Sequence, residues 1–172
     1  LVEDNWNNDI LLVRAPTGAG KTDASLLWAS RQIAAHKADR LVIAMPTRFT
    51  ANALSVNVAA TLSDTGLYHS SAWYSKYSKV QNGELDMKEA LAQQKMANLL
   101  ATPITVCTID HLLMSLTFTQ ESHHLICSNL ANSCVVIAEA DFYDDFTLAN
   151  IIFLLKVLHN WKVPVMIMSA SL

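Results

Sequence analysis

Residues Ala15–Thr22 have the composition and spacing of a loop that holds phosphate groups. They read Ala-Pro-Thr-Gly-Ala-Gly-Lys-Thr and lie between an apolar run and a helical stretch. Gly18 and Gly20 allow backbone conformations that a Cβ atom would oppose, and the free N–H groups of the next helix attract an anion. Lys21 would reach the β- and γ-phosphates, and the Thr22 hydroxyl would ligate Mg²⁺. The predicted phosphate-binding residues are Pro16, Thr17, Gly18, Ala19, Gly20, Lys21 and Thr22.

This loop departs from the general pattern at Ala15, which stands where a first glycine is usual. The alternative interpretation is an ordinary glycine-containing turn between a strand and a helix. The Gly-Lys-Thr triplet in this context favours the phosphate loop. Phosphate binding does not specify the reaction, because kinases, GTPases and motor ATPases share such a loop.

The segment Ala138-Glu139-Ala140-Asp141 follows another apolar run, at the kind of strand end where α/β sheets bind ligands. The usual order is an Asp that holds Mg²⁺, then a Glu that orients or deprotonates the attacking water. Glu139 can take the second role, whereas the Ala138 methyl group cannot bind a cation. Either an Asp has been replaced, in the laboratory or by natural decay, or the acidic residues merely cap the next helix. We favour replacement and expect weak nucleotide binding and very poor hydrolysis.

Thr47, Arg48 and Thr108 also follow apolar runs. Thr hydroxyls and helix N-termini position nucleic-acid phosphates, and Arg48 adds a cation. Each motif taken alone is better explained as a helix cap, through Thr47 or Thr50 in one case and Thr108 in the other. The two roles are compatible, because a capped N-terminus can still bind phosphate.

The runs that carry these residues alternate with helical stretches along the whole chain. They are rich in Val and Ile and apolar on both faces, as in a parallel sheet covered on both sides. We therefore predict an α/β fold with a doubly wound, mostly parallel sheet and helices on both faces. The predicted strands are Ile10–Val13, Leu41–Met45, Ile104–Cys107, Cys134–Ala138 and Val163–Met168, with a candidate sixth near Leu67–His69. The predicted helices are Lys21–Ala35, Thr50–Leu62, Glu84–Ala101, Thr108–Leu116 and about Leu148–Asn160.

Two stretches look like loops: the polar segment Tyr68–Gly83, a candidate exposed insertion, and Gln120–Ser133. Trp73, Tyr74 and Tyr77 in the insertion could stack on bases, anchor a partner or form a small satellite core.

Composition limits the class of protein. The 172 residues, 52% of them hydrophobic, suffice for one domain with a filled core. No apolar run is long enough to span a bilayer and no signal peptide is evident, so we expect a soluble, cytoplasmic protein that does not bind membranes. The chain begins with Leu1, and we expect it to be part of something longer. A net charge of -3 requires any nucleic-acid contact to be local.

Read together, the motifs resemble those of superfamily 2 helicases, in order and over nearly the whole chain. Residues 15–22 look like motif I, 46–48 like motif Ia, 102–110 like the motif Ib to Ic region, 138–141 like motif II and 169–171 like motif III. Three longer stretches, 46–53, 104–113 and 141–144, look like the helicase of type I CRISPR systems. The resemblance implies that residues 1–172 form one RecA-like domain, the first of the motor.

The resemblance also implies cofactors, partners and residue roles. ATP and Mg²⁺ would be the cofactors, with Lys21 and Glu139 catalytic and Thr22 on the metal. Single-stranded DNA would contact Thr47, Arg48 and Thr108. Nucleotide state would be coupled to the rest of the motor through Asp141, Ser169 and Ser171. The partners would be a second RecA-like domain, an RNA-guided surveillance complex and an HD nuclease.

The chain lacks some family features. No second RecA-like domain and no HD nuclease motif appear, since His123-His124 has no neighbouring Asp and is interpreted as loop. Three functions remain open: a DNA-translocating motor domain, a catalytically dead nucleotide-binding or scaffold module, and a superfamily 2 enzyme acting on RNA.

Overall fold

The computed structural model describes residues 2–61, 65–68, 86–117 and 121–171. Of the expected insertion Tyr68–Gly83, only Tyr68 is described, as the last residue of a strand; the rest, with Trp73, Tyr74 and Tyr77, lies outside the described residues.

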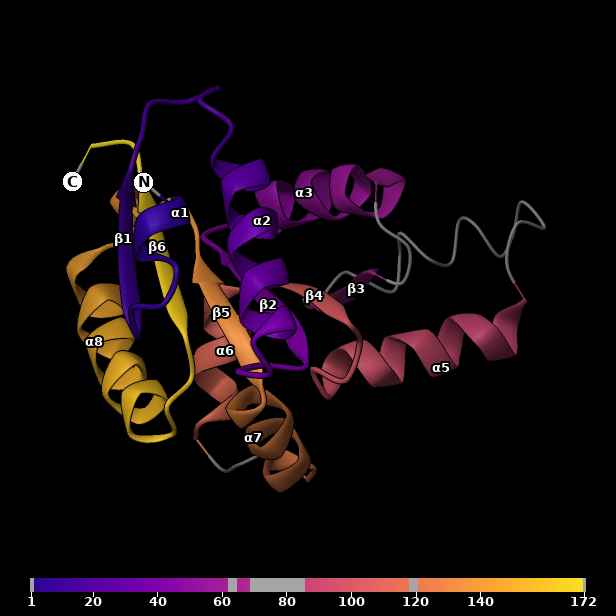
Figure 1. The fold of residues 1–172 in the computed structure, drawn as a ribbon. Helices are drawn as coiled ribbons and strands as arrows, with labels where there is room; N and C mark the ends of the chain where they lie inside the picture. Colours follow the sequence, from indigo (N-terminus) through magenta and orange to yellow (C-terminus); the bar gives the residue numbers. More distant parts are fainter. Residues whose placement is uncertain (1, 62–64, 69–85, 118–120, 172) are drawn as a thin grey trace.

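Six strands form one sheet in the order β1-β6-β5-β2-β4-β3, and every pairing is parallel (Figure 1). The strands are β1 (Ile10–Arg14), β2 (Arg40–Met45), β3 (Thr65–Tyr68), β4 (Ile104–Thr108), β5 (Ser133–Ile137) and β6 (Val165–Ser169). The predicted strands are confirmed with ends that differ by one or two residues. The candidate sixth strand is real but begins at Thr65.

Helices connect the strands as the alternation predicts. The helices are α1 (Val2–Asn5), α2 (Lys21–Ala34), α3 (Arg48–Thr61), α5 (Met87–Asn98), α6 (Ile109–Ser115), α7 (His123–Ala131), α8 (Asp145–Asn160) and the 3₁₀ turn η1 (Ala140–Phe142). Asp86 caps α5 by accepting from the Lys88 N–H, and Asp144 caps α8 by accepting from the Thr147 N–H. In the described part of the chain, no helix is both long enough and apolar enough to cross a membrane.

The loop predicted for Gln120–Ser133 is wrong over most of its length. His123 and His124 open helix α7, where their ring centroids lie 5.7 Å apart. Polar Ser, Asn and His residues obscure the helical spacing, but Ile126 and Leu130 lie one turn apart on one face and are buried. Tertiary burial of that face therefore overrides the weak local preference.

The sheet separates two apolar cores, one on each face. Along β2, Val42 and Ala44 belong to the core under α6, α7 and α8, whereas Leu41, Ile43 and Met45 belong to the core under α2 and α3. This alternation on a strand buried on both sides produces the continuous apolar run in the sequence. The doubly wound α/β fold is thus confirmed.

Truncating a residue of the first core should destabilise the chain strongly. Leu154 on α8 is fully buried, so Leu154→Ala should lower the free energy of unfolding by about 2–5 kcal/mol, through lost burial and a residual cavity. The neighbouring Phe153, 61% exposed, provides the control: Phe153→Ala should change stability by only about 0.5 kcal/mol or less. Equal losses in denaturant titrations of the two variants would contradict this packing.

Candidate functional site

Parallel strands bring their carboxyl ends to one edge of the sheet, where α/β folds bind ligands. The phosphate loop leaves β1, the acidic segment leaves β5, and Ser169 ends β6, which lies between these two strands. On the other side of β5, Thr47 follows β2 and Thr108 ends β4. All the predicted site residues therefore lie along one edge.

The phosphate loop depends on two glycine conformations. Gly18 and Gly20 have φ angles of 82° and 76°, and Gly20 is the N-cap of α2. An added Cβ would meet no atom within 4 Å at Gly18, so glycine is needed there for its backbone angle rather than for space. The loop is closed by a hydrogen bond of 3.2 Å from the Ala19 N–H to the Pro16 carbonyl.

Lys21, in the first turn of α2, bends back over this loop. Its Nζ donates to the Ala15 carbonyl at 2.7 Å. The ammonium group is thus held at the centre of the turn, with donors left for another acceptor. Phosphate oxygens are suitable partners at this position.

The acidic segment turns away from β5 immediately after Ala138. The Ala138 N–H still belongs to the sheet edge and donates to the Ala44 carbonyl at 2.9 Å. Glu139 adopts the left-handed conformation, with φ 54° and ψ 48°, which side-chain-bearing residues seldom occupy. The turn directs Glu139 into the same hollow as the phosphate loop.

Ser169 connects the two halves of the site. Its carbonyl accepts from the Ala15 N–H at 3.1 Å, and its hydroxyl hydrogen-bonds the Asp141 carboxylate. The Ala170 N–H donates to the same carboxylate at 2.9 Å, and the Ser171 N–H donates to Ser169 Oγ at 3.0 Å.

The hollow between these segments has a volume of about 400 Å³. Its lining comprises Thr17, Gly18, Gly20, Lys21, Thr22, Asp23, Glu139, Asp141, Phe142 and Ala170. The N-terminus of α2, two left-handed glycines and Lys21 fit a polyphosphate. Mg²⁺ prefers oxygen ligands and commonly combines carboxylates with phosphates and water, and Thr22 and Glu139 supply such oxygens. The side chain of buried Ala138 supplies none.

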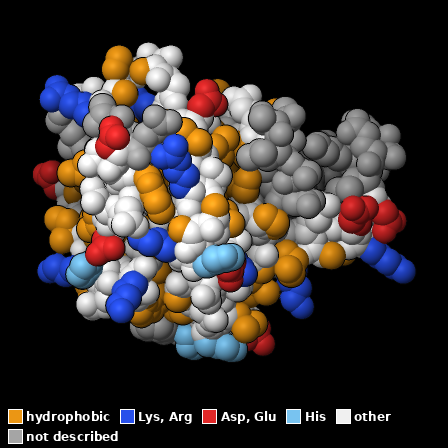
Figure 2. All heavy atoms as spheres, viewed as in Figure 1, with side chains coloured by type: hydrophobic (Ala, Val, Ile, Leu, Met, Phe, Trp, Pro, Cys, Tyr) orange, Lys and Arg blue, Asp and Glu red, His pale blue; other side chains and the backbone are white. Residues whose placement is uncertain are grey.

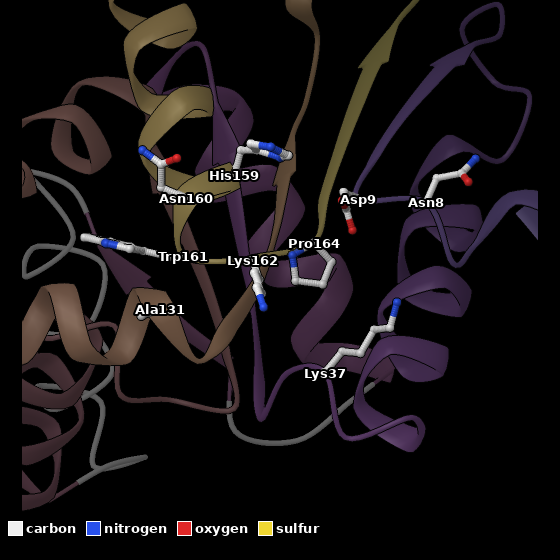
Figure 3. A pocket seen from close by; sticks show the side chains of 9 residues that line it. All are labelled: Asn8, Asp9, Lys37, Ala131, His159, Asn160, Trp161, Lys162 and Pro164. Carbon is white, nitrogen blue, oxygen red and sulfur yellow. The ribbon is translucent and has the colours of Figure 1, made fainter.

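A larger hollow, about 680 Å³, lies at the opposite edge of the sheet (Figure 3). It is formed where α8 ends and β6 begins, by residues that include His159, Trp161, Lys162 and Pro164. Lys37 and Lys162 line this hollow, but the helix end that lies here is the carboxyl end of α8, whose partial negative charge is unfavourable to an anion. Size alone therefore does not identify the nucleotide site.

The predicted nucleic-acid residues meet in a third hollow, about 320 Å³, lined by Pro46, Thr47, Arg48, Thr108, Asp110 and His111. Thr47 caps α3, since its hydroxyl accepts from the Thr50 N–H at 3.2 Å. Thr108 occupies the N-cap position of α6 but makes no side-chain cap bond. Its hydroxyl instead bonds His111 Nδ1 at 2.8 Å. The cap interpretation is thus confirmed for Thr47 and wrong for the Thr108 side chain.

His111 had no assigned role from the sequence, although it falls in the motif beginning at Thr108. Burial lowers the pKa of His111, and nearby Arg48 lowers it further, against the opposing effect of Asp110. A neutral ring is therefore favoured next to Arg48. In Figure 2, Lys and Arg side chains are scattered among acidic ones over the visible face, which agrees with local rather than bulk attraction for nucleic acid.

The chain matches the family model described as DEAD/DEAH box helicase over residues 3–172. It is 29% identical over 171 residues to the protein named as a CRISPR-associated nuclease/helicase Cas3 in Methanocaldococcus jannaschii, covering 98% of this chain and 24% of that relative. The chain thus spans about a quarter of that relative's length.

Solved structures agree with this relationship. The T. fusca Cas3-ATP crystal structure superposes with a TM-score of 0.79 at 27% identity, covering 95% of this chain and 19% of that one. A chain in a CRISPR RNA-guided surveillance complex, pre-nicking, gives a TM-score of 0.62 at 26% identity, covering 95% of this chain and 16% of that one. With the model match extending over almost every residue, the chain belongs to the DEAD/DEAH box helicase family and is similar to the helicase region of Cas3.

Proposed function

We propose that residues 1–172 are the first RecA-like, ATP-binding domain of a CRISPR-associated helicase that translocates on DNA and unwinds it. The main support is the single hollow that receives both the phosphate loop and Glu139. The second RecA-like domain would close over this hollow, and the motor would need both domains.

In this proposal the residues in and around the hollow have different tasks. Residues 16–22 hold the phosphates, and Lys21 neutralises charge on the β- and γ-phosphates. Glu139 orients the attacking water and accepts its proton. Asp141, Ser169 and Ser171 transmit the nucleotide state, a role supported by the bonds that join Asp141 to Ser169 and Ala170.

Mg²⁺ would supply charge neutralisation at the phosphates, with Thr22 as a protein ligand. Ala138 leaves Glu139 without the neighbouring carboxylate that normally steadies the ion. Hydrolysis by the chain as it stands should therefore be poor, while nucleotide binding persists in weakened form.

On the nucleic-acid side, Thr47, Arg48 and Thr108 would contact the backbone of single-stranded DNA. The proposed partners are an HD nuclease and an RNA-guided complex. A relative named as nuclease/helicase supports a nuclease, and the surveillance-complex chain supports an RNA-guided complex.

A second candidate, a catalytically dead nucleotide-binding or scaffold module, is favoured by Ala138 itself. A third, action on RNA, is separated from the first by comparing stimulation of ATPase activity by single-stranded DNA and RNA.

Replacing the phosphate-loop lysine should weaken nucleotide binding. Lys21→Ala removes the cation at the centre of the loop, so the Kd for a fluorescent ATP analogue should rise about tenfold or more, equivalent to about 1.4 kcal/mol. Lys162→Ala, at the opposite edge of the sheet, is the matched control and should leave the Kd unchanged. An unchanged Kd in the Lys21 variant would contradict the assigned site.

Restoring a carboxylate should separate the motor from the scaffold. Ala138→Asp in the longer protein that carries this domain should raise Mg²⁺-dependent, DNA-stimulated ATP turnover to about 1 s⁻¹ or faster, a common range for enzymes. Ala138→Asn introduces a side chain the size of aspartate without its charge, and should recover much less ATP turnover. If the aspartate variant binds ATP but gains no turnover, the scaffold interpretation is preferred.

Arg48→Ala tests the nucleic-acid surface. Losing one phosphate contact should lower affinity for single-stranded DNA and reduce the slope of log affinity against log salt by about 0.7. Lys88→Ala, at an exposed position of α5, should change neither the affinity nor the salt slope. The same salt slope in both variants would remove Arg48 from the proposed interface.

A further inference from the structure

The acidic segment rests on a buried side chain that the proposed chemistry does not use. Tyr143 is 9% exposed and belongs to the core under α6, α7 and α8. Its hydroxyl is buried too and donates to the Ala138 carbonyl at 3.1 Å. A phenol in an apolar core usually has its hydrogen bond satisfied, but here the acceptor is the last carbonyl before Glu139.

The turn that follows this carbonyl needs external support. Glu139 is left-handed, a conformation that costs free energy for a residue with a side chain. The turn itself is closed by one bond, from the Phe142 N–H to the Glu139 carbonyl at 3.0 Å. Such conformations persist where the surroundings over-determine them. The Asp141–Ser169 contact fixes the far end of the turn, and the Tyr143–Ala138 bond fixes its beginning.

We propose that Tyr143 is a positioning residue, whose buried hydroxyl holds the Ala138 carbonyl and thereby keeps the Glu139 carboxylate aimed into the phosphate hollow. This inference rests on the proposed function, because it assigns Glu139 the task of orienting water.

The chemistry of the phenol suits this task. Burial, together with nearby Cys107, Glu139 and Asp110, raises the pKa of Tyr143 far above its ordinary value. The hydroxyl therefore stays protonated, and remains a hydrogen-bond donor, over the pH range in which proteins are folded. The ring also fills core volume, so a purely packing role has to be separated from the hydrogen bond.

Tyr143→Phe removes the hydroxyl and keeps the ring. The matched control is Ile151→Val, which trims a 5% exposed residue of the same core in helix α8, outside the turn. The first measurement is amide hydrogen exchange of residues 138–142 in the nucleotide-free chain. Exchange at the Phe142 amide should accelerate in Tyr143→Phe and stay unchanged in Ile151→Val. Equal exchange in the two variants overturns the proposal.

The second measurement compares binding of ADP with binding of ADP plus aluminium fluoride, in the longer protein that carries this domain with Ala138→Asp. Aluminium fluoride mimics the transferring phosphoryl group and so reports on the water that Glu139 orients. Tyr143→Phe should leave the Kd for ADP within about twofold and weaken the fluoride complex about tenfold, because misplacing a reacting group by 1 Å can cost about 100-fold. Glu139→Gln should weaken it similarly, and the double variant should add little.

If Tyr143 only fills the core, Tyr143→Phe should weaken the binding of ADP and of ADP with aluminium fluoride equally. That result would overturn the proposal. If the chain bound no ADP even with Tyr143 and Ala138→Asp in place, the proposed function would fail. Hydrogen exchange would then still decide whether Tyr143 holds the turn.

Discussion

Ser169 makes the contacts on which the arrangement of the site depends. Its carbonyl bonds the first residue of the phosphate loop, Ala15, and its hydroxyl bonds Asp141. Because β6 lies between β1 and β5, one residue can reach both sides. The phosphate loop, residues 15–22, and the acidic segment, residues 138–141, are far apart in sequence and are therefore held in place relative to each other by the end of one strand.

The parallel sheet imposes the geometry around this contact. With both faces buried, the strands are mostly apolar, and the polar side chains of the site lie where the strands end. Helices α2, α3 and α6 then begin at that edge, so their free N–H groups face the place where anions would bind. The two apolar cores thus determine where the chemistry can occur.

Ala138 places no carboxylate at the start of the acidic segment, yet the backbone there is fully bonded. Its backbone still pairs with β2 and still receives the Tyr143 hydroxyl, so the turn that presents Glu139 is intact. A side-chain oxygen at position 138 would therefore enter a site whose backbone is already in place. The fold therefore agrees with an aspartate position occupied by alanine better than with a segment that merely caps a helix, since α8 is capped by Asp144 instead.

The sequence by itself determined the strands, the phosphate loop and the order of the motifs, because these follow from local patterns: glycine spacing, apolar runs and strand ends. It could not reveal helix α7, whose polar surface hides a face recognisable only by the burial of Ile126 and Leu130. Nor could it pair Thr108 with His111, Tyr143 with Ala138, or Ser169 with both Ala15 and Asp141. The Ser169 contacts depend on strand order, because only the folded sheet brings those distant segments to one edge. The Thr108–His111 and Tyr143–Ala138 bonds join residues close in sequence, but they depend on the directions that the side chains take when the segments pack.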